Sequence, residues 1–278
     1  MARNFQELLH ARWDEGKFLC VGLDSDLDKI PESAHKSNNR ETLVAFNRAI
    51  VDATKDLVCA YKPNSAFYEA WGDEGWQALR ETAQYIIEQA PGVPVILDAK
   101  RGDIGNTNNG YVEAIFGHLL MDAVTVHPYL GSEALKPFLD RKDKGVFVLC
   151  RTSNPGAGEL QDLMVNEDPL YKKVAHIVAQ KWNTNGNCGL VVGATYPDEL
   201  KEVRSIVGDM PILIPGIGAQ GGDLEKAVQK GRDAHGKGII LTAARSIIFA
   251  SKEKDFADAA RKETEKIDDQ IRNAMVSR

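Results

Sequence analysis

The sequence predicts an α/β protein that folds as a single (β/α)8 barrel of the phosphate-binding type. Three observations predict this fold: eight short apolar runs, helical segments between them, and polar residues where the runs end. The chain has 278 residues, within the size range of α/β barrels, which commonly fold as one domain. We therefore expect one barrel domain over residues 1–278, with an extra N-terminal helix and a C-terminal helix.

The eight apolar runs are bounded by turn residues and predict eight β-strands. They span 18–23, 57–61, 94–97, 123–126, 145–150, 189–192, 211–214 and 238–241. Each run is almost continuously apolar, which is typical of parallel strands that are covered on both faces.

Segments with helical spacing alternate with these runs, for example at 41–55, 75–89, 168–182 and 198–207. Such alternation indicates a parallel sheet, and eight units favour closure into a barrel. Two further helices, around 4–13 and 252–275, lie outside the eight units, and we expect them to cap and pack the barrel. Residues 152–167 show no clear structural pattern, so we expect a loop that serves as a lid.

Composition excludes several other classes of protein. The net charge is −6 and the 34 basic residues are scattered, which disfavours a nucleic-acid surface. No run is long enough for a membrane span and the N-terminus lacks a signal pattern, so we expect a cytosolic protein. The four cysteines lie in or beside apolar runs without a C-x-x-C pair, which predicts buried thiols rather than zinc ligands or disulfides.

Charged residues end several of the predicted strands, where barrel enzymes carry their active sites. Asp98, Lys100 and Asp103 form the pattern D-x-K-x-x-D after the third run, and Lys62 ends the second. Residues two apart on a strand point the same way, so Asp98 and Lys100 should both face the barrel mouth. Opposite charges about 4 Å apart attract by roughly 4 kcal/mol at an effective dielectric near 20, which keeps both lysines charged. Lys100 is then expected to act as an acid and not as a Schiff-base nucleophile.

Two plainer interpretations of this charge cluster remain. A lone Asp and Lys pair is usually a surface salt bridge, but four charged groups at neighbouring strand ends favour a site. Two carboxylates at this spacing also suit Mg²⁺, although the intervening Lys100 would compete for them.

A glycine-rich stretch predicts a phosphate site. Residues 215–223 read P-G-I-G-A-Q-G-G-D after the seventh run, and Arg245 follows the eighth. Glycines let backbone N–H groups approach a phosphate, and Arg245 adds charge-assisted hydrogen bonds. Without the arginine, an ordinary glycine-rich turn would be the alternative.

Residues 98–107, read as D-A-K-R-G-D-I-G-N-T, resemble the signature of the orotidine 5'-phosphate decarboxylases, and most closely that of the type 2 subgroup. The resemblance extends from 21–24 through 62–64 and 215–223 to 245–246. It implies decarboxylation of orotidine 5'-monophosphate to uridine 5'-monophosphate and CO2, the last step of de novo UMP biosynthesis. It also implies that no metal or organic cofactor takes part and that Lys100 protonates a carbanion at C6.

The resemblance also implies roles for individual residues. In the family, the residue matching Asp98 crowds the substrate carboxylate. A homodimer is implied, in which the partner subunit supplies Asp103, Ile104 and Thr107. The expected substrate contacts are Asp24 and Lys62 with the ribose, Ser153 with the pyrimidine, Pro215 with the base pocket, and Gln220, Gly221 and Arg245 with the phosphate.

Two other functions compete with this interpretation. A Mg²⁺-dependent keto-sugar phosphate decarboxylase or aldolase would share the phosphate site and an aspartate and lysine pattern, but Ser153 and Lys62 argue against it. A non-catalytic barrel would bind a uridine phosphate without turnover. His127, which ends the fourth run beside a proline, is interpreted as structural.

Overall fold

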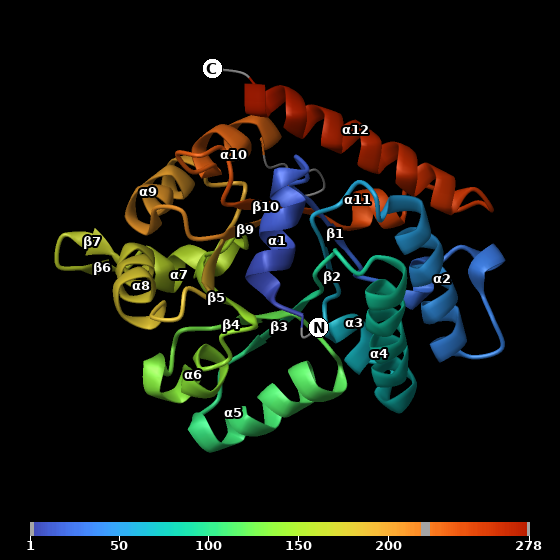
Figure 1. Ribbon diagram of the computed structural model, residues 1–278, viewed down its shortest axis with the longest axis horizontal. Coiled ribbons are helices and arrows are strands. Elements are labelled where there is room, and N and C mark those ends of the chain that lie inside the picture. Colours follow the sequence, from blue (N-terminus) through green and yellow to red (C-terminus); the bar gives the residue numbers. More distant parts are fainter. Residues whose placement is uncertain (1–2, 218–222, 277–278) are drawn as a thin grey trace.

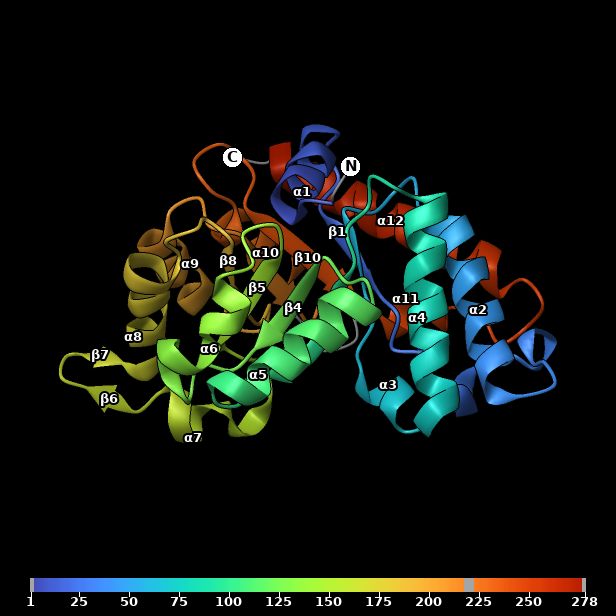
Figure 2. The same cartoon turned by 60° about the horizontal axis from the view of Figure 1, so that its bottom comes forward.

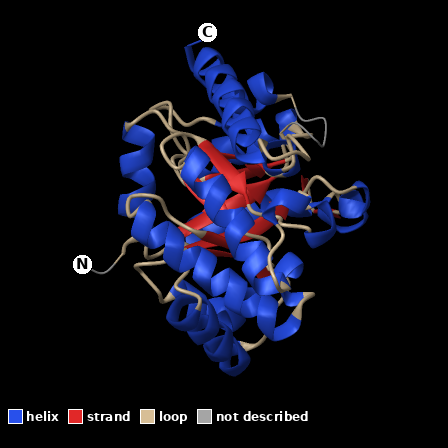
Figure 3. Cartoon of the chain, turned by 90° about the vertical axis from the view of Figure 1, so that its right-hand side faces the viewer, coloured by secondary structure: helices blue, strands red, loops and turns tan. Residues whose placement is uncertain are grey.

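The computed structural model describes residues 3–217 and 223–276 and confirms the predicted barrel. Eight parallel strands follow each other in the order β2-β1-β10-β9-β8-β5-β4-β3, and helices surround them (Figure 3). Two single parallel bridges, Tyr61 to Val95 and Asn64 to Asp98, join the β2 and β3 regions and close the ring. The barrel strands are β1 (Leu19–Gly22), β2 (Ala60–Lys62), β3 (Ile96–Arg101), β4 (Ala123–Val126), β5 (Gly145–Arg151), β8 (Cys188–Val192), β9 (Ile212–Pro215) and β10 (Ile239–Ala243).

Helices follow the strands as the alternating pattern predicts. The α-helices are α1 (Phe5–Asp14), α2 (Asn39–Thr54), α3 (Ala66–Glu69), α4 (Gly72–Gln89), α5 (Gly105–Val112), α6 (Gly131–Leu139), α7 (Gly158–Gln161), α8 (Leu170–Ile177), α9 (Pro197–Val207), α10 (Leu224–Gly231), α11 (Arg245–Ile248) and α12 (Phe256–Val276). Two π-helical segments, η3 (Glu113–His118) and η5 (Val178–Trp182), extend α5 and α8. Short 3-10 turns are η1 (Leu27–Lys29), η2 (Glu32–Ala34) and η4 (Pro155–Ala157).

The segment 152–167 was expected to show no clear structural pattern, but it contains regular secondary structure. It contains η4, α7 and the first strand of a small hairpin, β6 (Met164–Val165) with β7 (Asp168–Pro169), which projects from the periphery (Figure 2). These pieces are too short to give a periodic hydrophobic pattern. Buried Arg151 anchors the segment: its guanidinium pairs with Asp162 at 3.0 Å and lies 3.9 Å from the ring centre of Tyr196.

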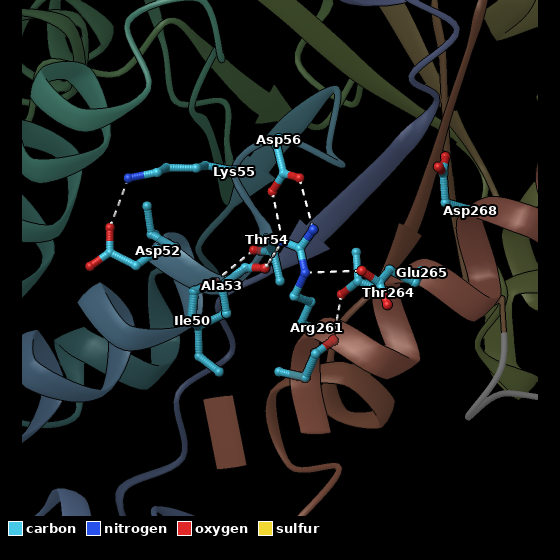
Figure 4. Close-up of polar contacts among 12 residues, drawn as sticks. Ile50, Asp52, Ala53, Thr54, Lys55, Asp56, Arg261, Thr264, Glu265 and Asp268 are labelled. Atoms are coloured by element: carbon cyan, nitrogen blue, oxygen red, sulfur yellow. Dashed lines mark hydrogen bonds and ion pairs between the residues drawn. The ribbon is translucent and has the colours of Figure 1, made fainter. Parts of the chain in front are cut away.

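The two terminal helices pack at different places on the barrel. Helix α1 lies across the N-terminal ends of the strands (Figure 1), where the Trp13 indole N–H donates to Ile239 O at 2.9 Å. Helix α12 packs against α2 and α10, and Arg261 ties it to Asp56, which follows α2, at 2.9 Å (Figure 4). Within α12, Arg261 also pairs with Glu265. The helix expected around 4–13 is observed at Phe5–Asp14, and the helix expected around 252–275 begins later, at Phe256, and ends at Val276.

A buried arginine fastens the loops at the N-terminal ends of β9 and β10. The guanidinium of Arg204, on α9, donates to the carbonyls of Gly231, Gly208, Met210 and Gly238 at 2.6 to 2.7 Å. These four charge-assisted hydrogen bonds offset the free-energy cost of burying the guanidinium.

The cysteines are buried, as predicted, and are unpaired thiols. Burial raises the pKa of Cys20, which lies in β1, to about 12. No helix among the described residues is long and apolar enough to cross a membrane.

Candidate active site

A cavity of about 500 Å³ opens at the C-terminal ends of the strands. Most of the residues that the sequence singled out line it, although they come from six different strand ends. The lining includes Asp24, Lys62, Asp98, Lys100, Ser153, Pro215 and Arg245. The barrel has brought together side chains that are up to 221 positions apart, from Asp24 to Arg245.

A chain of alternating charges forms one wall of this cavity. Lys62 Nζ lies 3.2 Å from Asp98 Oδ2 and 3.9 Å from Asp24 Oδ1, and Lys100 Nζ donates to Asp98 Oδ1 at 2.7 Å. The Lys62 side chain is only 5% exposed, whereas that of Lys100 is 49% exposed. Asp98 therefore pairs with the buried ammonium of Lys62 through Oδ2 and with the accessible ammonium of Lys100 through Oδ1.

The pairing fixes the charge of the two buried members. Burial alone would raise the pKa of Asp98, but Lys62 and Lys100 outweigh it and hold that pKa well below its usual range. Burial likewise disfavours charge on Lys62, yet Asp98 and Asp24 raise its pKa above the ordinary value. An ionised carboxylate and a protonated buried lysine therefore coexist near neutral pH.

The backbone does not follow the simple strand alternation from which we predicted this arrangement. The pairing of β3 with β4 shifts register between Leu97 and Arg101, and Lys100 has a φ of 48°. A positive φ is rare for a residue with a Cβ, and a bulge of this kind re-aims a side chain. Asp98 and Lys100 both face the mouth, as predicted, but through a bulge and not through regular pleating.

His127 packs against this bulge. A Cβ on Gly102, whose φ is 151°, would lie 2.8 Å from the His127 ring, so the close packing requires glycine. His127 Nδ1 accepts the Tyr129 N–H at 3.3 Å, which orients the ring.

The predicted base and phosphate residues line the same cavity from the ends of β5, β9 and β10. Ser153 lines the cavity and packs closely on Gly193. A Cβ added at Gly193 would lie 2.8 Å from the side chain of Ser153. Pro215 ends β9 and Arg245 begins α11, and both line the cavity. Gln220 and Gly221 fall outside the described residues.

Three predicted residues do not reach this cavity within one chain. Asp103, Ile104 and Thr107 are exposed at the start of α5, and the Ile104 residue is 61% exposed. Buried Asn108 holds their turn by accepting the Asp103 N–H at 3.1 Å and donating to Ala134 O at 2.6 Å.

Sequence reasoning missed several residues that line the cavity. Thr125 lies inside an apolar run and Thr242 directly follows one, and a single threonine there carries no distinguishing signal. Gln161 reaches the site from α7, a helix too short to predict, and accepts the Thr152 N–H at 2.8 Å. Buried polar atoms without a hydrogen-bond partner in the described part of the chain include Asp24 Oδ1 and Thr242 Oγ1.

Comparison with known proteins gives a consistent result. Residues 17–261 match the family model described as "Orotidine 5'-phosphate decarboxylase / HUMPS family". The chain is 50% identical to the orotidine 5'-phosphate decarboxylase of Janthinobacterium sp. (strain Marseille), and the match covers 92% of this chain and 94% of that protein. It is 52% identical to the orotidine 5'-phosphate decarboxylase of Cupriavidus metallidurans, and this match covers 92% of this chain and 93% of that protein. The solved structure of Leishmania donovani OMP decarboxylase is similar with a TM-score of 0.83, 39% identity and coverage of 97% of this chain and 99% of that one.

Proposed function

Because the chain belongs to the orotidine 5'-phosphate decarboxylase / HUMPS family, we propose that its cavity converts orotidine 5'-monophosphate into uridine 5'-monophosphate and CO2. The enzyme is an orotidine 5'-phosphate decarboxylase and serves pyrimidine biosynthesis. The observation that carries the mechanism is the Lys62, Asp98 and Lys100 charge chain at the cavity wall. It supplies a fixed anion and an accessible ammonium at one place, without a metal or an organic cofactor.

Lys100 is the proton donor in this proposal. The bond from C6 to the carboxylate breaks, CO2 leaves, and the electron pair stays on C6 as an sp2 carbanion. The Lys100 ammonium then transfers a proton to C6, and solvent returns a proton to the amine. Asp98, which accepts from Lys100 at 2.7 Å, orients the ammonium and crowds the substrate carboxylate. A charge that is preorganised in this way stabilises the carbanion as it develops.

The remaining lining residues bind the unreacting parts of the nucleotide. Asp24 Oδ1 is a buried acceptor that lies 3.9 Å from Lys62 Nζ and has no hydrogen-bond partner among the described residues, so it suits a ribose hydroxyl beside Lys62. Ser153 is assigned to the pyrimidine, Pro215 to the base pocket and Arg245 to the phosphate. Gln220 and Gly221 belong to the same phosphate loop in this proposal. Binding energy from phosphate and ribose helps to organise the reacting groups.

A homodimer completes the site in this proposal, with Asp103, Ile104 and Thr107 donated across the interface. The support is their exposure together with that of Tyr129 and Leu130 before α6, which are 85% and 45% exposed. Helices α5 and α6 pack together, so these side chains share one region. Large exposed apolar groups of this kind mark protein interfaces.

The proposed activity is tested by the ultraviolet absorbance change of orotidine 5'-monophosphate with purified protein, with and without EDTA. Turnover that resists the chelator supports both the reaction and its metal-free mechanism. Turnover that EDTA abolishes keeps the reaction and overturns the mechanism. Folded protein without turnover refutes the proposal and favours a binding role or a sugar-phosphate substrate.

The shared site has its own test in mixed dimers. Lys100→Ala and Asp103→Ala should each be nearly inactive, because each impairs both sites of its homodimer. After subunit exchange, half of the dimers are mixed and one of their two sites is intact, so about a quarter of the wild-type activity should return. No recovery from a mixture shown to exchange subunits would refute donation of Asp103 across the interface.

A further inference from the structure

We propose that Thr125, on β4, is a positioning residue whose hydroxyl sets the placement of both Asp98 and Lys100. The inference rests on the proposed function, because it concerns the proton donor of that reaction. The observation behind it is one hydroxyl group that contacts both members of the catalytic pair. Thr125 Oγ1 lies 2.9 Å from Asp98 Oδ1 and 3.0 Å from the backbone nitrogen of Lys100.

The direction of these two hydrogen bonds follows from the chemistry of the groups. The Lys100 N–H can only donate, so the Thr125 oxygen accepts from it. Asp98 is ionised and can only accept, so the single hydroxyl proton points to Oδ1. The hydroxyl therefore cannot reorient without losing one bond, and it links the carboxylate to the backbone that carries the lysine.

The local backbone explains why such a link is needed. Lys100 has a φ of 48° and lies where β3 shifts register against β4, so regular sheet pairing does not hold its N–H in place. A positive φ is unfavourable for a residue with a Cβ, and surrounding contacts must maintain it. Thr125 can provide this contact because β4 is held on its other side by β5, through the pairing of Thr125 with Phe147.

Burial leaves little room for water to replace the threonine. Thr125 is 1% exposed, and Asp98 Oδ1 already accepts from Lys100 Nζ at 2.7 Å. Loss of the hydroxyl would leave the Lys100 N–H unpaired and would remove one of two donors that orient this oxygen. The accessible ammonium would then lose its fixed distance from C6 of the substrate.

The test compares Thr125→Val, which keeps the shape and removes the hydroxyl, with Thr125→Ser, which keeps the hydroxyl. We measure kcat and KM for orotidine 5'-monophosphate and the Kd of uridine 5'-monophosphate by calorimetry. A displacement near 1 Å can lower a rate about a hundredfold, so kcat of the valine variant should fall by about 10- to 100-fold. KM and Kd should stay within about threefold, because Thr125 touches the reacting pair and not the phosphate contacts. The serine variant should recover most of kcat.

Thr264→Val is the matched control. Thr264 is also fully buried and its hydroxyl donates to Ala260 O at 2.7 Å, but it lies on α12, away from the cavity. If Thr125→Val does not fold, Thr125→Ala takes its place in the comparison with serine.

Three results would overturn the inference: an unchanged kcat in the hydroxyl-free variant, an equal loss in the serine variant, or a matching loss of nucleotide affinity. A wild-type protein that does not decarboxylate the nucleotide would refute the proposed function itself, and with it this inference. If the wild-type protein is active, the kinetics of the Thr125 variants test this inference alone and leave the proposed function standing.

Discussion

Replacement of Lys100 by alanine should remove the proton donor while leaving the remaining charge pair in place. Lys62 still lies 3.2 Å from Asp98, and Thr125 still donates to it, so the carboxylate remains ionised and held. The loss can be estimated from Coulomb attraction between the ammonium and the C6 carbanion. At about 3 Å and an effective dielectric near 20, the attraction is about 5.5 kcal/mol. A loss of this size corresponds to a decrease in kcat of about four powers of ten.

The decrease is measured from the ultraviolet absorbance change of orotidine 5'-monophosphate, and binding from the Kd of uridine 5'-monophosphate, which lacks the carboxylate. Lys100→Ala should change this Kd by less than about tenfold, because the lysine acts on the reacting carbon. Lys136→Ala is the matched control: this lysine on α6 pairs with Asp140 at 2.7 Å and its side chain is 68% exposed. A Lys100→Ala enzyme that keeps kcat within tenfold of wild type would refute the assignment.

Three further predictions concern phosphate binding, stability and pH. Arg245→Ala should raise KM by roughly 10- to 100-fold, from the loss of a charge-assisted hydrogen bond of about 1.5 to 3 kcal/mol; an equal effect on orotidine, which has no phosphate, would contradict this role. Arg204→Met should lower the free energy of unfolding in urea by about 3 kcal/mol, because four buried carbonyls lose their donor, while kcat at low temperature stays normal. The folded pKa of Asp98 is depressed below an unfolded value of about 3.9, so its stabilising contribution is present above about pH 4 and is lost as the pH falls through the folded value. The difference in unfolding free energy between wild type and Asp98→Asn should therefore be constant from about pH 5 to 8 and shrink below about pH 4; a difference that already shrinks between pH 7 and 5 would contradict this pairing.

The sequence predicted the barrel because its signals are local and repeated. Each strand is a short apolar run, and every expected run overlaps an observed strand, including 123–126, which matches β4 residue for residue. The run at 57–61 was less accurate: its first three residues precede β2, which extends to Lys62. The boundary is set by pairing with β1, and hydrophobicity alone does not reveal such pairing.

The site was predictable where residue types are unusual for their position. Charged residues that end buried strands stand out, so Asp98, Lys100 and Lys62 could be found and placed on one cavity. The bulge at Lys100 could not be predicted, because it depends on contacts with Thr125 and on the packing of Gly102 against His127. These are long-range contacts between chemically ordinary residues, and a single sequence does not encode them in any periodic signal.

The closure of the barrel has a consequence for its motions. β2 and β3 are joined by two single bridges, and the Lys62 to Asp98 ion pair crosses the same seam. The amide hydrogens of Tyr61 and Asp98, which donate across it to Pro94 O and Pro63 O, should exchange with solvent faster than those of the continuous ladders elsewhere. A nucleotide that contacts both charged residues would hold this seam together, so occupancy of the cavity and the integrity of the ring are coupled through one pair of strands.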